Sequence, residues 1–318
     1  MHLIVPFASA VSPAGRQAME SLVLPQLQRL LSGMQSVQTG GSDEFSLSAP
    51  HELALAAAHA WPLNDGAIPF ASALAREAGL DTHAAAWALL TPVHLHLGTD
   101  QVTLTDPADL QLDAADSRAL FDAIYPLFDS EGFDLHWRAR DQWLATHAVF
   151  DSLATASLDR VIGRNIDRWL PDAPQARLLR RLQNEVQMLL YTHPMNDRRE
   201  AAGVPTVNSV WYSGSGSGQV IAATAADEHL TDLSHGTTVV DDRLRRPALG
   251  EDWAAWCEAW RALDAGPIAE LLRQPGAIQL SLCGERRFMR FEPNARSWSQ
   301  RLAQAWRRPA IHTVLEAL

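Results

Sequence analysis

The stretch that determines the fold of this chain runs from Leu182 to Gly218 and reads LQNEVQMLLYTHPMNDRREAAGVPTVNSVWYSGSGSG. His193 and Pro194 end a helix, Asn196 caps a second, shorter helix, and Val207–Tyr212 has the composition of a strand. The first helix is amphipathic, because apolar residues recur at spacings of three and four, at Leu178, Leu182, Val186 and Leu189. The stretch therefore predicts a helix, a capped turn and a strand in succession.

The predicted strand leads into a glycine-serine loop, which is the candidate binding site of the chain. Its glycines can expose backbone N–H groups to an anion, and the arginines of the preceding turn can pair with a phosphate or carboxylate. A flexible connection is the alternative interpretation of such a loop. The residues that we expect to bind a ligand are Asn196, Arg198, Arg199, Asn208, Ser213, Gly214, Ser215 and Gly216.

Composition excludes several classes of protein. The net charge of -11 argues against general binding of nucleic acid or of an anionic membrane surface. The chain contains no lysine, so Walker-type phosphate loops, Schiff bases and Ser-x-x-Lys acylation are excluded. Its 2 cysteines are too few for a disulfide framework. No apolar run approaches the roughly twenty residues that cross a bilayer, so we expect a cytoplasmic protein.

Motifs assign no catalytic residue, metal or cofactor. The glycine-serine loop does not contain Gly-x-Ser-x-Gly, and Gln219–Ala223 is strand-like where a nucleophile elbow or a dinucleotide-binding turn needs a helix. His94 and His96 share one strand face, which suits zinc, but the polar face of a hairpin explains them as well. Cys283 precedes Gly284 and two arginines, so it is either an activated thiol or a buried inert one.

The chain as a whole mixes strands and helices, which predicts an α/β protein. Leu3–Phe7 is a buried strand, Gly15–Leu31 a helix that Pro25 kinks, and Ser32–Pro50 a loop. A β-hairpin is expected within Trp87–Leu104, where apolar residues alternate. We expect a central mixed sheet with flanking helices, built from residues 1–50 and 206–318, and a largely helical middle region at residues 51–205 that carries the hairpin.

Three tryptophans form a stripe on a predicted helix near the C-terminal end. Trp253, Trp256 and Trp260 are spaced by three and four residues, so their rings share one face. Core packing explains such a stripe. A subunit interface is the second interpretation, which would make the Trp253–Trp260 helix the contact of a homo-oligomer, and a ligand stacked on the rings is the third.

Several segments of the chain resemble a family of bacterial regulatory proteins of the RpfE type, which many genomes label phosphoglycerate mutases. They are NEVQMLLYTHPMNDRR, VNSVWYSGSG, PHELALA, TPVHLHLG, SLDRVIGR and LSLCGE. His193-Pro194-x-Asn196-x-x-Arg199 with Asn208 is also similar to a segment of cofactor-independent phosphoglycerate mutases of the alkaline-phosphatase superfamily. This resemblance implies a reduced alkaline-phosphatase-like core, two divalent metals and a Ser or Thr nucleophile.

The chain departs from that mutase pattern at the positions that hold the metals. The first strand runs into Phe7-Ala8-Ser9-Ala10 without an aspartate, and Ala277–Cys283 carries no Asp or His. We therefore expect a regulatory or ligand-binding protein without metal-dependent mutase activity, which binds a small phosphorylated metabolite. The alternative is a metal-dependent phosphoglycerate mutase or phosphatase that draws on His94, His96, Asp241 and Asp242.

Overall fold

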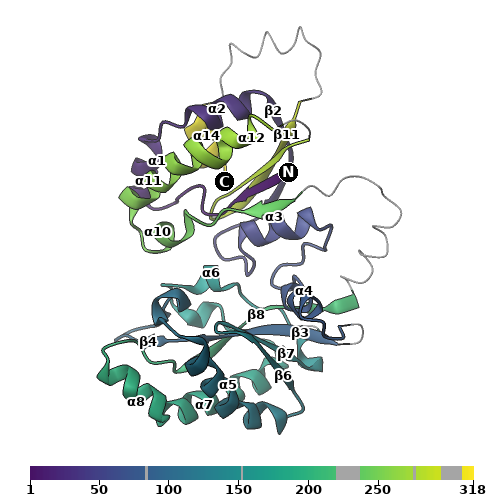
Figure 1. Ribbon diagram of the computed structural model, residues 1–318, viewed down its shortest axis with the longest axis vertical. Coiled ribbons are helices and arrows are strands. Elements are labelled where there is room, and N and C mark those ends of the chain that lie inside the picture. Colours follow the sequence, from purple (N-terminus) through teal and green to yellow (C-terminus); the bar gives the residue numbers. More distant parts are fainter. Residues whose placement is uncertain (83–84, 152, 220–236, 275–276, 295–309) are drawn as a thin grey trace. The chain divides into compact units, whose positions relative to one another are not determined.

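The computed structural model describes residues 1–318 except 83–84, 152, 220–236, 275–276 and 295–309 (Figure 1). The chain divides into two compact units. The first unit comprises Met1–His59 and Asp232–Leu318, and the second comprises Ala60–Thr231. Within the described ranges, no helix combines the length and the apolar character that are needed to cross a membrane.

The first unit is built on a mixed five-stranded sheet. In the sheet, β1 (His2–Val5) pairs in parallel with β10 (Gln279–Cys283) on one side and with β9 (Thr238–Val240) on the other. Antiparallel pairing continues the sheet from β10 to β11 (Arg287–Pro293) and then to β2 (Met34–Gly41). The order is β2-β11-β10-β1-β9, so segments from both ends of the sequence lie side by side. This mixed sheet confirms the predicted α/β class.

Helices cover both faces of this sheet (Figure 1). One face packs against α3 (Pro50–Ala58), which contacts β1, β2, β10 and β11. The opposite face holds the main core of the unit, which includes Leu3, Val5, Leu280 and Leu282. The other helices are α1 (Pro13–Glu20), α2 (Pro25–Ser32), α10 (Arg245–Leu249), α11 (Trp253–Leu263), α12 (Ala269–Leu271) and α14 (Ile311–Glu316), with a π-helical turn at Asp264–Ile268.

The second unit is built on an antiparallel four-stranded sheet. Its order is β6-β7-β3-β8, and its strands are β6 (Asp134–Ala139), β7 (Gln142–Thr146), β3 (Ala86–Val93) and β8 (Ser209–Ser217). The expected hairpin forms a separate pair, β4 (Leu95–Leu97) and β5 (Val102–Leu104).

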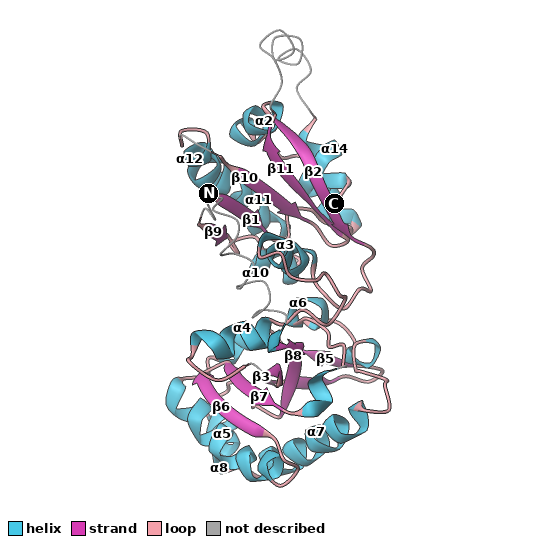
Figure 2. Cartoon of the chain, turned by 90° about the vertical axis from the view of Figure 1, so that its right-hand side faces the viewer, coloured by secondary structure: helices cyan, strands magenta, loops and turns pink. Residues whose placement is uncertain are grey.

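Helices also lie on both sides of the second sheet (Figure 2). The large core lies between the sheet and the two longest helices of the unit, α5 (Ala114–Asp129) and α7 (Ala176–Tyr191). On the other face, α4 (Phe70–Glu77) packs against β3 and β8. The remaining helical segments are α6 (Leu158–Val161), α8 (Pro194–Ala201) and 3-10 turns at Pro107–Leu110, Ala148–Asp151 and Ile166–Arg168.

The structure corrects several details of the sequence prediction. The helix expected over Gly15–Leu31 is broken into α1 and α2, because Pro25 begins a new helix instead of kinking one. The expected loop after Ser32 contains β2. The boundary expected between residues 205 and 206 would assign β8 to the first unit, but β8 pairs with β3 along its length and belongs to the second.

Candidate functional site

A groove of about 590 Å³ opens on the second unit at the end of α7. It brings together the last residues of α7, one side of α8, the segment that leads into β8, and the tip of β4. Two of the eight expected binding residues are in its wall. The lining residues are Leu97, Gln187, Tyr191, Thr192, Asn196, Asp197, Glu200, Thr206 and Asn208.

The turn between α7 and α8 is shaped by His193 and Asn196. His193 Nδ1 accepts a hydrogen bond from the N–H of Met195 at 3.3 Å, so His193 is the N-cap of α8. The sequence prediction that Asn196 caps this helix is wrong. Asn196 is buried and donates to the carbonyls of Leu190 and Val207, both at 2.8 Å. Its side chain therefore joins the end of α7 to the segment that leads into β8, in the wall of the groove.

Asn208 attaches the hairpin of β4 and β5 to the segment that leads into β8. Its Oδ1 accepts from the N–H of Leu95 at 2.7 Å, and its Nδ2 donates to the carbonyl of Leu95 at 2.9 Å. The amide thus satisfies both backbone groups of Leu95, as a neighbouring strand would. His94 is fixed beside it, because its Nδ1 lies 2.9 Å from the carbonyl oxygen of Thr206. The groove wall is consequently held by side chain to backbone hydrogen bonds.

The charged side chains of the groove are acidic. Asp197 and Glu200 lie three residues apart on α8, so both point to the same side of the helix, and both are exposed. Among the described residues, neither carboxylate has an ion-pair partner. The groove therefore presents two free negative charges beside amide and hydroxyl groups.

The two arginines expected to bind an anion are engaged elsewhere. Arg198 points to Asp116, with 3.6 Å between Nη2 and Oδ1, on an exposed surface. Arg199 is buried, and its guanidinium donates to the carbonyls of Pro205, at 2.8 Å, and of Leu110. Burial lowers the pKa of Arg199, and the nearby carboxylates of Asp116 and Asp113 oppose this effect. The Arg199 guanidinium thus holds the segments around Leu110 and Pro205 together. Neither Arg198 nor Arg199 is therefore free to bind the expected anion.

The glycine-serine residues lie at the other end of β8, so the expected single site is divided into two places. Ser213 to Gly216 are part of the strand and not of a loop. The Ser215 hydroxyl is buried and donates to the carbonyl of Leu153 at 2.5 Å. The carbonyl of Gly216 accepts from Ser72 of α4 at 2.8 Å. These polar groups hold α4 and the segment around Leu153 against the strand.

The glycines in this part of β8 allow α4 to approach the backbone. Gly214 has a φ of +60°, and a Cβ there would lie 3.1 Å from the Cβ of Phe70. Gln219, which is expected to begin a strand, is helical together with Gly218, and residues 220–223 of that prediction lie outside the described part of the chain. The glycines of β8 therefore serve packing.

The other candidate residues are also accounted for by local structure. The rings of His94 and His96 lie 6.4 Å apart in the second unit, whereas Asp241 and Asp242 belong to the first. Arg243 binds the Asp241 carboxylate at 2.6 and 2.8 Å. Across the residues that the structure describes, no three His, Cys, Asp or Glu side chains are grouped so that they can hold a metal ion.

Cys283 and two of the three tryptophans of the stripe lie in the interior of the first unit, and Trp253 is partly buried. Burial raises the pKa of the Cys283 thiol well above its usual value, so the thiol is the inert one of the two alternatives. Trp256 and Trp260 are fully buried in the core, and their rings meet edge to face with centroids 6.1 Å apart. These two rings therefore fill the core and are not available to a subunit interface.

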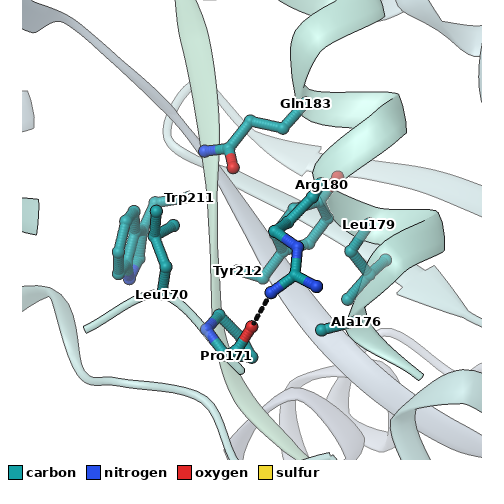
Figure 3. A pocket seen from close by; sticks show the side chains of 8 residues that line it. All are labelled: Leu170, Pro171, Ala176, Leu179, Arg180, Gln183, Trp211 and Tyr212. Atoms are coloured by element: carbon teal, nitrogen blue, oxygen red, sulfur yellow. Dashed lines mark hydrogen bonds between the residues drawn. The ribbon is translucent and has the colours of Figure 1, made fainter. Parts of the chain in front are cut away.

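A second, much narrower crevice lies between β8 and the start of α7 (Figure 3). Its free space is about 10 Å³, which suits a single water molecule. Arg180 lies across it and donates to the carbonyl of Pro171 at 2.7 Å. The Tyr212 hydroxyl is buried there without a hydrogen-bond partner, and burial raises its pKa. The crevice is a packing defect beside a tyrosine, too small for a metabolite.

Comparison with known proteins gives distant structural similarity. No family model and no curated protein matches the chain. The PH0037 protein from Pyrococcus horikoshii is 13% identical, with a TM-score of 0.43 over 92% of this chain and 87% of that chain. A cofactor-independent phosphoglycerate mutase from Thermoplasma acidophilum DSM 1728 is 12% identical, with a TM-score of 0.36 over 100% of this chain and 98% of that chain. Similarity at this level assigns no residue a role.

Proposed function

We propose that this chain is a binding protein of the regulatory type, and that the groove at the end of α7 is its binding site. The volume of about 590 Å³ is within the range of ligand sites in proteins. The role is that of the RpfE-type regulatory proteins whose segments the sequence resembles. Metal-dependent mutase activity is not part of the proposal.

The observation that carries the proposal is the pair of free carboxylates, Asp197 and Glu200, at a groove with a preformed wall. Carboxylates accept hydrogen bonds and attract positive charge, so the ligand presents N–H donors or a cation to them. Gln187 and Thr192, on and just after α7, add polar groups to the lining of the groove. The ligand that we propose is therefore cationic or rich in N–H donors, and not the phosphorylated metabolite that the sequence predicts, because the two carboxylates would repel a phosphate.

A thermal-shift screen tests this proposal. The purified chain is heated with spermidine, arginine and lysine as cationic probes, and with 3-phosphoglycerate and inorganic phosphate as anionic ones. We expect cationic probes to raise the midpoint temperature of unfolding and anionic probes to leave this temperature unchanged, since a ligand that binds the native state stabilises that state by mass action.

Variants locate the effect at the groove. The double substitution Asp197→Asn with Glu200→Gln should abolish the stabilisation. A matched pair, Asp129→Asn with Asp167→Asn, removes two exposed carboxylates of the same unit elsewhere and should retain it. Equal stabilisation of both double variants by the cationic probes would contradict the proposal. Mn²⁺-dependent turnover of 3-phosphoglycerate would establish the mutase alternative instead.

A further inference from the structure

Large apolar side chains project into solvent around the groove. Among the described residues of the second unit, the three most exposed are Tyr191 at 83%, Met188 at 77% and Leu97 at 69%. Tyr191 and Leu97 line the groove, and Met188 precedes Tyr191 by one helical turn. Single exposed apolar residues are ordinary, but a group of three beside one groove is typical of an interaction surface.

The helix α7 shows why these residues are not simply misplaced core residues. Its buried side includes Leu182, Val186 and Leu190, which pack into the core of the unit. Met188 and Tyr191 are three residues apart and share the opposite, solvent-facing side. The helix is therefore complete without them, and the apolar area that they expose is available to a partner.

We propose that the groove and its apolar rim bind a basic segment of another protein, an inference that rests on the function proposed above. A Lys or Arg of that segment pairs with Asp197 and Glu200, and a large apolar side chain packs on Tyr191 and Leu97. Gln187, Thr192 and Thr206 then offer polar groups to the backbone of the bound segment.

The combination of charge and apolar area favours this partner over two others. A small amine neutralises the carboxylates but leaves Met188 and Tyr191 in water. An uncharged protein surface covers the apolar rim but removes two unpaired carboxylates from water, which is unfavourable. A second copy of this chain carries the same net charge of -11, so long-range repulsion opposes its approach, whereas a basic partner is attracted.

Fluorescence anisotropy with labelled peptides tests the inference on the full chain. The probe is a short peptide that alternates lysine with leucine and phenylalanine, and its two controls replace either the lysines by glutamate or the apolar residues by serine. We expect the probe to bind, and both controls to bind at least about tenfold more weakly. Higher salt should weaken binding of the probe, because exposed charges contribute to it.

Variants separate the two parts of the surface. Each of two double variants should weaken the binding of the probe peptide about tenfold. They are Asp197→Asn with Glu200→Gln, and Tyr191→Ser with Met188→Ser. The control variants Asp129→Asn with Asp167→Asn, and Leu63→Ser at another exposed apolar residue, should not. All of these side chains are exposed, and thermal unfolding of each variant verifies that it folds.

The outcomes distinguish this inference from the proposed function. Stabilisation by spermidine that depends on Asp197, without binding of the peptide, overturns the inference and leaves the proposed function standing. Absence of both effects overturns the two together. Sedimentation that shows a dimer of the wild type, lost on Tyr191→Ser, identifies a second copy as the occupant and also overturns the inference.

Discussion

The carboxylate of Asp264 accepts a hydrogen bond from the backbone N–H of Leu27 at 2.7 Å, across most of the sequence. It also accepts from the N–H of Gln26 at 3.2 Å. These groups lie in the first turn of α2, where N–H groups lack helical partners, and the N-cap residue Leu24 has no side chain that can bind them. The π-helical turn that follows α11 thus supplies the cap of a helix near the other end of the chain.

Substitution of this remote cap should destabilise the first unit. Asp264→Ala leaves two N–H groups without their acceptor in a buried place, so we expect the free energy of unfolding to fall by about 1–2 kcal/mol. Asp264→Asn keeps one acceptor oxygen and should lose less. Urea unfolding of the two variants and the wild type measures the difference. Equal loss in both would show that the carboxylate charge, and not the cap, provides the stability.

His2 makes the stability of the same unit depend on pH. Its Nε2 lies 2.8 Å from the Ser281 hydroxyl in the neighbouring strand, and the ring is buried. Burial lowers the pKa of His2 to about 4, and the positive charges of Arg290 and the N-terminus add to this. Because the unfolded chain takes up the proton at a higher pH than the native state, stability is complete above about pH 6.5 and falls as the pH drops toward 4.

The size of this pH effect can be measured against a variant. Between about pH 7 and pH 4.5, the loss due to His2 should be on the order of 2–3 kcal/mol. His2→Gln retains a polar group beside Ser281 but does not titrate, so its free energy of unfolding should change less over the same interval. Parallel pH curves for His2→Gln and the wild type would show that other groups cause the acid sensitivity.

Sequence patterns predicted those parts of the fold that local residues determine. The apolar run of β1 and the helical spacing in α7 and α11 are properties of neighbouring residues, and the structure has these elements where the sequence predicts them. By contrast, β2 has the sequence MQSVQTGG with mostly exposed side chains, so it shows no apolar alternation. It is a strand because β11 provides hydrogen-bond partners, which a local pattern does not reveal.

Local sequence features also account for only a part of the candidate site. Asn196 and Asn208, two of the residues that we expect to bind a ligand, line the groove, and polar residues at the ends of elements are local features. The role given to Arg199 was wrong because its acceptors include the carbonyl of Leu110, far away in the sequence. Tyr191 was missed, although a large aromatic residue off the apolar side of an amphipathic helix is a signal that the sequence contains.

Two glycines with similar backbone conformations separate strain from packing. Gly214 and Gly203 have φ angles of +60° and +70°, but a Cβ on Gly203 would meet nothing within 4 Å, whereas one on Gly214 would meet Phe70. Gly203→Ala should therefore cost about 1 kcal/mol from the left-handed backbone alone. Gly214→Ala should cost more, about 2–3 kcal/mol, because α4 must also move. Equal losses in urea unfolding would mean that α4 yields freely.

Two buried hydroxyl groups on β8 should respond in opposite ways to removal. The Tyr212 hydroxyl has no hydrogen-bond partner, so Tyr212→Phe removes a buried polar group that stabilises nothing, and stability should stay equal or rise by up to about 1 kcal/mol. Ser215→Ala removes a hydroxyl that binds the carbonyl of Leu153 and should cost about 1 kcal/mol or more. Urea unfolding compares the two. Destabilisation by Tyr212→Phe would show that a water in the crevice of Figure 3 binds the hydroxyl.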